Sequence, residues 1–428
     1  MVKKLKIIPN WIKLDNAATI YPSTLTRKYA SMFRVSVTLK EQVDELILNK
    51  ALKIILKRFP TFNYKLNQGL FWHYFKHINS VPIIEEDVNN PMIRINFKEN
   101  KGFMFRVRYY DKSISFECFH ALTDGTGAIT FLLSLVAEYL KIKNKISIEY
   151  SDKILNPKKS PKKEEIMDSF QKYARKTTFL EQEKTAYHYK GTLIDSHLLN
   201  IITGEILVDD IKKISKRYDC TITQFFVSVI LSSLQDIQEK ERRKNNKPLK
   251  VLVPINLRNF YKSNTMRNFS SYVNIGIETK YGHYNFDEII KIVKNSMGLM
   301  ITEKKLNAKI SSNVKLARNY FIRLIPMFLK KYILSFSEYL MGDRYCSTTF
   351  SNLGNIDLPN SMSKYIKNIN FIIGRSRNNP GTISCVSCND KLYISFSRRI
   401  KETELEKLFF TKLVEMGIPV LIESNNRR

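Results

Sequence analysis

Residues 113–141 read SISFECFHALTDGTGAITFLLSLVAEYLK and join two stretches of different periodicity. Up to Phe119 apolar and polar side chains alternate, which is the period-two pattern of a half-buried strand. From Ala128 onward the apolar residues recur at steps of three and four, which is typical of an amphipathic helix. The sequence therefore predicts a strand and a helix, joined by a short loop that begins at His120.

The loop contains a histidine, an aspartate and a glycine at fixed spacing: His120, Asp124 and Gly125. An imidazole, with an ordinary pKa of about 6.5, can accept a proton at neutral pH and so suits general-base catalysis. A histidine at a strand end beside an Asp-Gly turn is also a common structural combination. These residues alone leave both interpretations open.

The spacing H-x-x-x-D-G after a strand resembles the active-site motif of the chloramphenicol acetyltransferase-like superfamily. That superfamily includes alcohol acetyltransferases, plant acyltransferases and the condensation domains of peptide synthetases. The resemblance implies that His120 is the general base and that Asp124 is structural, turned away from the substrate and paired with an arginine. Gly125 would supply backbone freedom where a side chain would clash. The resemblance also implies two α/β sandwich domains with mixed sheets and an active-site channel between them.

A second point of resemblance is the segment PINLR, residues 254–258. In the superfamily a strand ending in a P-x-x-L-R type sequence brings an arginine to the motif aspartate. The resemblance implies that Arg258 pairs with Asp124 and that Asn268 lies in the loop that follows. Arg34 and Arg106 are alternative partners for the aspartate.

A third segment, CSTTFSNLGNIDLP at residues 346–359, resembles the strand and S-N-x-G turn beside the histidine in the superfamily. A hydroxyl there can donate a hydrogen bond to the oxyanion of a tetrahedral intermediate. Thr349 and Ser351 are both candidates, and Asn352 belongs to the same turn. The plant D-F-G-W-G motif is absent, and Phe119 stands where condensation domains have a second histidine. The chain is most similar to the bacterial alcohol acetyltransferase and condensation-like branch.

The composition is strongly basic, with a formal net charge of +30 and an isoelectric point near 9.7. Such a balance fits nucleic acid, an anionic membrane surface or a phosphorylated ligand, although a lysine-rich solvated surface also explains it. Because no nucleic-acid-binding motif accompanies the charge, we do not expect nucleic acid as a partner. Peripheral membrane contact is compatible with the basic amphipathic segment 314–340, for which we favour packing within the protein's own core.

The five cysteines are too scattered for a disulfide framework, and Cys385 and Cys388 lie in a predicted hairpin, so we expect no metal site. The N-terminus lacks a signal-peptide pattern, and no apolar run of about 20 residues occurs. We therefore expect a cytoplasmic protein. The resemblance implies that acyl-CoA is a co-substrate and that no cofactor is bound, and we expect a monomer.

The length of 428 residues predicts two or three domains, of which we choose two. We place an acyltransferase-like domain carrying the motif at residues 1–151, a solvated linker at 152–190 and a second acyltransferase-like domain at 191–428. The linker assignment rests on its proline and lysine content. A T-x-x-Q capping box at Thr221 begins a helix in the second domain.

The combined prediction is an enzyme that transfers an acyl group from a coenzyme A thioester to an alcohol or amine. Two alternatives remain: a condensation-type enzyme that uses a carrier-protein thioester, and a non-catalytic member that binds a lipid, a polyketide or a partner protein.

Overall fold

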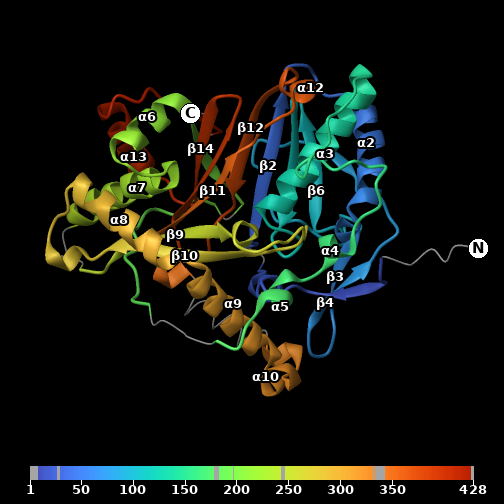
Figure 1. Cartoon of the computed structure of the whole chain (residues 1–428), viewed down its shortest axis with the longest axis horizontal. Coiled ribbons are helices and arrows are strands. Elements are labelled where there is room, and N and C mark those ends of the chain that lie inside the picture. The colour runs from blue at the N-terminus through green and yellow to red at the C-terminus, as the bar shows by residue number, and fades with distance from the viewer. Residues whose placement is uncertain are drawn as a thin grey trace, which may run out of the picture.

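The computed structural model describes residues 8–26, 29–177, 183–195, 197–241, 246–330, 332 and 343–425. Figure 1 shows two α/β halves side by side, one mainly blue to teal and one mainly green to red. Each half has its own sheet and its own cluster of buried apolar side chains. Both sheets combine parallel and antiparallel strand pairs, so the predicted α/β class with mixed sheets is confirmed.

The sheet of the first half has five strands in the order β12-β2-β7-β6-β5. Its strands are β2 (Met32–Leu39), β5 (Ile84–Glu86), β6 (Phe105–Tyr110), β7 (Ser113–Phe119) and β12 (Ile366–Ile373). Helices α2 (Glu45–Arg58) and α3 (Gly125–Asn144) pack together beside it (Figure 1). At the centre of this core the rings of Phe62 and Phe131 stack, and Phe105 and Phe116 contact both.

Strand β7 is buried on both faces rather than on one. Its alternating pattern predicted a solvated face at Ser115 and Glu117, but both side chains are fully buried. Glu117 forms ion pairs with Arg34 on β2 and Arg106 on β6, which compensates its charge away from water. The prediction of a half-buried strand was therefore wrong, because cross-strand ion pairs replace solvent on the polar face.

The sheet of the second half has seven strands in the order β10-β9-β11-β13-β14-β8-β15. Its strands are β8 (Asn200–Leu207), β9 (Leu249–Asn256), β10 (Ser270–Ile277), β11 (Thr348–Asn355), β13 (Gly381–Cys388), β14 (Lys391–Arg398) and β15 (Leu421–Ser424). The helices of this half are α6 (Val208–Arg217), α7 (Ile222–Glu239), α8 (Phe286–Met300) and α13 (Glu404–Glu415). Helix α7 begins at the predicted capping box, with reciprocal hydrogen bonds between Thr221 and Gln224.

One strand links the two halves through hydrogen bonds. Strand β12 comes from the region assigned to the second domain, yet it pairs with β2 in the first sheet, where Phe371 lies opposite Val35. The side chain of Ser384 on β13 donates to the backbone oxygen of Phe371, which ties the second sheet to the crossing strand. The sheet of the first half is therefore completed by the C-terminal part of the chain. The domain boundaries at residues 151 and 191 stay a prediction.

The segment predicted as a solvated linker is packed over part of its length. It contains the short helices α4 (Lys163–Ile166) and α5 (Ser169–Tyr173). Glu165 forms a buried ion pair with Arg58 of α2, at 2.5 Å, and Phe170 contacts the ring of Phe269. Lysine and proline content indicated solvent exposure, but these few buried side chains fix the segment across both halves.

A small three-stranded sheet, in the order β1-β4-β3, lies at one end of the first half. Its strands are β1 (Trp11–Lys13), β3 (Tyr64–Gln68) and β4 (His73–His77). Helices α9 (Glu303–Arg318) and α10 (Tyr320–Leu324) project from the second half toward the same end, at the bottom of Figure 1. Two further short α-helices among the described residues are α1 (Tyr21–Thr24) and α12 (Asn360–Ser363).

The amphipathic segment 314–340 does not form one core helix over its described part. Helix α9 ends at Arg318, α10 is a separate short helix, and Phe321 and Phe328 have exposed fractions of 80% and 63%. The expectation that the apolar side chains of this segment pack in the protein's own core was therefore wrong for Phe321 and Phe328, whereas Val314 and Met327 are buried. The rest of the segment lies outside them.

Among the described residues, α3 is long and apolar enough to cross a membrane, but 78% of its most apolar window is buried inside the protein. Helices α6 and α7 meet the same criterion only as one span, which is bent by 80°. Burial of this kind is also found in the core helix of a globular domain.

Candidate active site

His120 lies at the end of β7, immediately before the loop that leads into α3. Its backbone N–H donates to the backbone oxygen of Ser31, at 2.8 Å. The imidazole stacks on the ring of Tyr21, with centroids 4.7 Å apart, and the ring of Phe33 packs edge-on at 5.1 Å. Two aromatic rings and one backbone bond therefore hold the imidazole in a defined plane.

The amide of Asn268 sets the tautomer of His120. The Asn268 Nδ2 group donates to Asp15 Oδ2 and to the backbone oxygen of Ala121, both at 3.3 Å. Its carbonyl Oδ1 is then the atom that faces His120 Nδ1, at 3.1 Å. Because Oδ1 can only accept a hydrogen bond, Nδ1 carries the proton and Nε2 carries the lone pair. His120 is therefore a base whose lone pair is on Nε2.

The surroundings of His120 favour its neutral form. Burial lowers the pKa of His120 below its ordinary value, while its own backbone, Asp124, Asn268 and Asp15 act in the opposite direction. At neutral pH the imidazole is therefore unprotonated and able to take a proton.

Asp124 points away from the imidazole and fixes the backbone around it. Its Oδ1 caps α3 by accepting the backbone N–H of Gly127, at 3.1 Å. Its Oδ2 accepts both Arg258 Nη1 and the backbone N–H of Phe269, each at 2.8 Å. The structure thus brings Asp124 and Arg258 together as an ion pair, while Arg34 and Arg106, the alternative partners, pair with Glu117.

Arg258 also organises the loop that carries Asn268. Its Nη2 donates to the backbone oxygens of Thr265 and Arg267, at 2.7 Å and 2.8 Å. Since Asn268 follows Arg267 directly, the same guanidinium that pairs with Asp124 also shapes the loop that orients the histidine. The first and second halves of the chain therefore meet at this site.

Close steric fit explains the two glycines at the start of α3. A Cβ on Gly125 would lie 2.6 Å from Leu353 Cδ2, and one on Gly127 would lie 2.5 Å from the backbone oxygen of Met266. Gly125 has no positive φ, so the implied backbone freedom is not used there, whereas the implied side-chain clash is present, with the end of the Leu353 side chain. Leu353 belongs to the S-N-L-G turn, which places this turn against the motif loop.

The hydroxyls of Thr349 and Ser351 share one face of β11, because Phe350 between them points into the core of the second half. Ser351 lies opposite Ser384, on the side of the sheet that the crossing strand β12 covers. Thr349 lies opposite Thr382 on the same side, so the choice between the two oxyanion candidates, and the role of either, stays a prediction.

Asn352 shapes the turn rather than the reacting group. Its side chain accepts the backbone N–H of Gly354 at 2.7 Å and donates to Thr223 at the start of α7. Gly354 has a φ of +76°, a conformation that glycine adopts readily. The Asn-Leu-Gly sequence is therefore the turn that presents Leu353 to the motif loop.

Sequence reasoning missed Asp15, Tyr21 and Phe33, which contact Asn268 or the imidazole directly. Asp15 is fully buried, and its Oδ1 accepts the backbone N–H of Ala18 at 2.8 Å. The sequence around it, LDNAA, signals only an Asx-type turn, in which aspartate is usually exposed. No local pattern distinguishes a buried turn aspartate from a solvated one.

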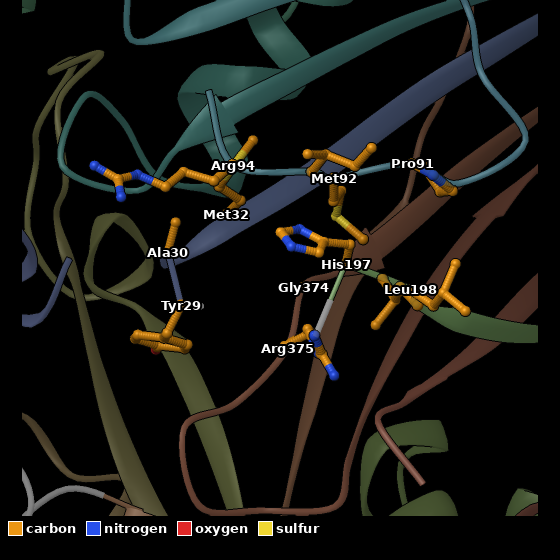
Figure 2. Close-up of a pocket in the computed structure, with 12 residues that line it drawn as sticks. Tyr29, Ala30, Met32, Pro91, Met92, Arg94, His197, Leu198, Gly374 and Arg375 are labelled. Atoms are coloured by element: carbon orange, nitrogen blue, oxygen red, sulfur yellow. The ribbon is translucent and has the colours of Figure 1, made fainter. Parts of the chain in front are cut away.

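A pocket with a volume of about 40 Å³ lies between segments of both halves (Figure 2). Figure 2 shows Met32 and Met92 of the first half beside His197 and Arg375 of the second. Ligand pockets usually have volumes of about 300 to 1,000 Å³, so this space is too small for an acyl-CoA. Its lining does not include His120, and the predicted channel between the domains stays a prediction.

No side-chain cluster for a metal ion is present among the described residues, since no three His, Cys, Asp or Glu side chains come together there. The buried thiols of Cys385 and Cys388 lie on β13, in the hairpin with β14 that turns at Asn389 and Asp390, as the sequence indicated.

No protein-family model matches this sequence, and no curated protein matches it. Solved structures do match over nearly the whole chain. The first condensation domain of the calcium-dependent antibiotic synthetase, in complex with a substrate analogue, has a TM-score of 0.61 at 10% identity over 96% of this chain and 99% of that chain.

Trichothecene 15-O-acetyltransferase from Fusarium sporotrichioides has a TM-score of 0.59 at 10% identity, over 95% of this chain and 94% of that chain. The starter condensation domain of rhizomide synthetase, in complex with C8-CoA and Leu-SNAC, has a TM-score of 0.57 at 9% identity, over 96% and 95%. At these identities the likeness establishes the fold alone. The chain therefore has the fold of these condensation domains and of this acetyltransferase.

Proposed function

We propose that this protein transfers an acyl group from a coenzyme A thioester to an alcohol or amine, with His120 as the general base. The observation that carries the proposal is the geometry of His120. Asn268 holds Nδ1 as a donor, which leaves the lone pair on Nε2, and burial keeps the imidazole neutral. A purely structural histidine gains nothing from this arrangement.

In the proposed reaction His120 Nε2 takes the proton from the acceptor as its oxygen or nitrogen attacks the thioester carbon. The hydroxyl of Ser351, or of Thr349, donates to the oxyanion of the tetrahedral intermediate. When the intermediate collapses, the carbon–sulfur bond breaks and the thiolate leaves with the proton that His120 accepted. Donor and acceptor are bound together, and no covalent acyl-enzyme forms.

Coenzyme A itself is part of the proposal. The rhizomide condensation domain, which shares the fold, was determined with C8-CoA, and the formal charge of +30 suits a phosphorylated donor. A carrier-protein thioester is the second candidate donor, because condensation domains of synthetases share the fold.

The test is thiol release from a panel of acyl-CoAs in the presence of pooled alcohols and amines. We expect His120→Ala to reduce release by about a hundredfold or more, because a general base contributes about that factor. His283→Ala, at an exposed histidine on the second half, is the matched control and should retain the wild-type rate.

Release from acyl N-acetylcysteamine thioesters but not from acyl-CoAs would instead identify a carrier-type donor. Saturable acyl-CoA binding without turnover over the whole acceptor pool would contradict catalysis and favour a binding module. Equal release by wild type and His120→Ala would exclude His120 as the base.

A further inference from the structure

An exposed apolar surface lies at the end of the molecule where α10 and the β3–β4 hairpin meet. We call it the aromatic end, and its most prominent side chains are Trp72, Tyr320, Phe321, Leu324, Phe328 and Tyr332. Their exposed fractions range from 46% for Trp72 to 80% for Phe321. Soluble proteins rarely leave so many large apolar side chains together in water, and such patches usually mark a binding surface.

The two elements form one surface rather than two separate exposed tips. The backbone N–H of Met327 donates to the backbone oxygen of Leu70, at 2.7 Å, and Lys330 Nζ donates to the backbone oxygen of Phe71, at 2.8 Å. Figure 1 shows α10 and the hairpin projecting from the same end of the molecule. Trp72 directly follows Phe71, so it lies beside this contact in the chain.

The charge around the aromatic end has a single sign. Lys315, Arg318 and Arg323 are exposed on α9 and α10. The sequence has no acidic residue between Glu303 and Glu338, and none in residues 46–84, which include the hairpin. Within the described part of the chain no carboxylate pairs with these cations, and Arg318 donates to the neutral side chain of Gln171.

Exposed aromatic and aliphatic side chains with flanking cations and no acid are the features of a segment that lies in the interface of a lipid bilayer. The apolar side chains enter the acyl boundary, and each nearby cation adds attraction to anionic headgroups. A second copy of this chain would bring like charges into contact, which disfavours association through the same surface. We propose that the aromatic end docks the protein on the surface of an anionic lipid bilayer.

The test is vesicle flotation with the full-length chain. We expect wild type to float with vesicles of phosphatidylcholine and phosphatidylserine, to float less in about 0.5 M than in about 0.1 M NaCl, and to stay unbound with phosphatidylcholine alone. The double variant Phe321→Ser/Phe328→Ser should bind mixed vesicles at least about tenfold more weakly, since it removes two inserted rings. Arg318→Gln/Arg323→Gln should weaken binding by a similar factor.

The matched control is Leu46→Ser/Leu299→Ser, which removes two equally exposed apolar side chains from α2 and α8, and it should bind like wild type. Binding that depends on the arginines but not on Phe321 and Phe328 would overturn the proposal, because it would be nonspecific attraction of a basic protein. The proposal would also be overturned if the wild-type protein did not float. If light scattering then showed a wild-type dimer and a monomeric phenylalanine variant, the aromatic end would be identified as a subunit interface. Because flotation requires no turnover, the result is independent of the acyl-transfer assay.

Discussion

Two buried carboxylates approach His120 from distant parts of the chain and are held in different ways. Asp124, in the loop after β7, accepts three hydrogen bonds, one of them from Arg258. Asp15, in the segment after β1, accepts two, from the backbone N–H of Ala18 and from the Asn268 amide. Asp124 is thus held by the backbone and by an arginine. Asp15 is connected to the imidazole through the side-chain amide of Asn268.

The difference extends to charge compensation. The nearest cation to Asp15 is Arg267, whose Nε lies 3.5 Å away and makes no hydrogen bond among the described residues. Burial raises the pKa of Asp15 above its ordinary value, with Arg267 acting against it. Loss of the contacts of Asp124 should therefore cost stability, while loss of the charge of Asp15 should change the chemistry at His120. The predictions below test that division.

The largest expected effect is on stability. Arg258→Ala leaves the Asp124 carboxylate buried without its cation and removes the donor for the backbone oxygens of Thr265 and Arg267. We expect the free energy of unfolding in urea to fall by about 3 to 5 kcal/mol. Arg175→Ala, which breaks an exposed pair with Glu303, should change it by about 1 kcal/mol or less. Equal losses in the two variants would show that Asp124 does not depend on its arginine.

The second expected effect is on turnover. In Asp15→Asn the new amide can turn its N–H group toward Asn268, whose side chain would then flip to accept with Oδ1, at the cost of the hydrogen bond from Nδ2 to the backbone oxygen of Ala121. The flip turns an N–H group toward His120 Nδ1, which then must accept, so Nε2 becomes protonated and loses its lone pair. We expect kcat to fall by about tenfold to a hundredfold with little change in KM.

The control for Asp15→Asn is Asp209→Asn, at an exposed aspartate on α6, which should leave both constants unchanged. The free energy of unfolding of Asp15→Asn should not decrease, because the variant removes a carboxylate that is buried with incomplete compensation. A fall in kcat that accompanies a large loss of stability would indicate a purely structural function for Asp15 and would remove the contrast with Asp124.

A smaller effect should appear in the pH profile. Because burial lowers the pKa of His120, the acid limb of kcat/KM should lie below the ordinary histidine pKa of about 6.5. The negative charge of Asp15 is one of the factors that raise the pKa of His120, so its removal should move the acid limb of Asp15→Asn to lower pH. An unchanged limb, measured in the same buffers, would mean that Asp15 stays neutral in the wild type.

Short motifs predicted the residues around Asp124 because a motif specifies a residue together with its partner. The structure contains an ion pair between Asp124 and Arg258. The H-x-x-x-D-G motif predicted the aspartate, and the P-x-x-L-R segment predicted the arginine. Asp15 had no such signal, since its burial depends on β4, Arg267 and Asn268, all distant in sequence. Local sequence patterns do not show which distant residues bury a turn.

The same limit explains the errors in the fold. Alternation in β7 predicted a solvated face, but Arg34 and Arg106 from neighbouring strands cover Glu117. The amphipathic pattern of the segment 314–340 indicated a helix with an apolar face and could not show that this face points outward at Phe321. Likewise nothing near β12 indicated that it completes the sheet of the other half. Periodicity predicts which side chains share a face. What packs against that face depends on residues that are distant in sequence.

The smallest expected effects compare the two glycines beside Asp124. In Gly127→Ala the new methyl group would meet Thr123 and the backbone oxygen of Met266, which cannot move independently, so we expect a loss of about 1 to 3 kcal/mol in urea unfolding. In Gly125→Ala the methyl group meets only the end of the Leu353 side chain, which can shift to another rotamer. Gly125→Ala should therefore be nearly neutral, and Leu353→Ala should relieve whatever loss it shows. Gly125 faces Leu353 of the S-N-L-G turn, and Gly127 faces Met266 of the loop that Arg258 organises. If Gly125→Ala loses more free energy of unfolding than Gly127→Ala, the S-N-L-G turn fixes the loop around Asp124 more firmly than the Arg258 loop does.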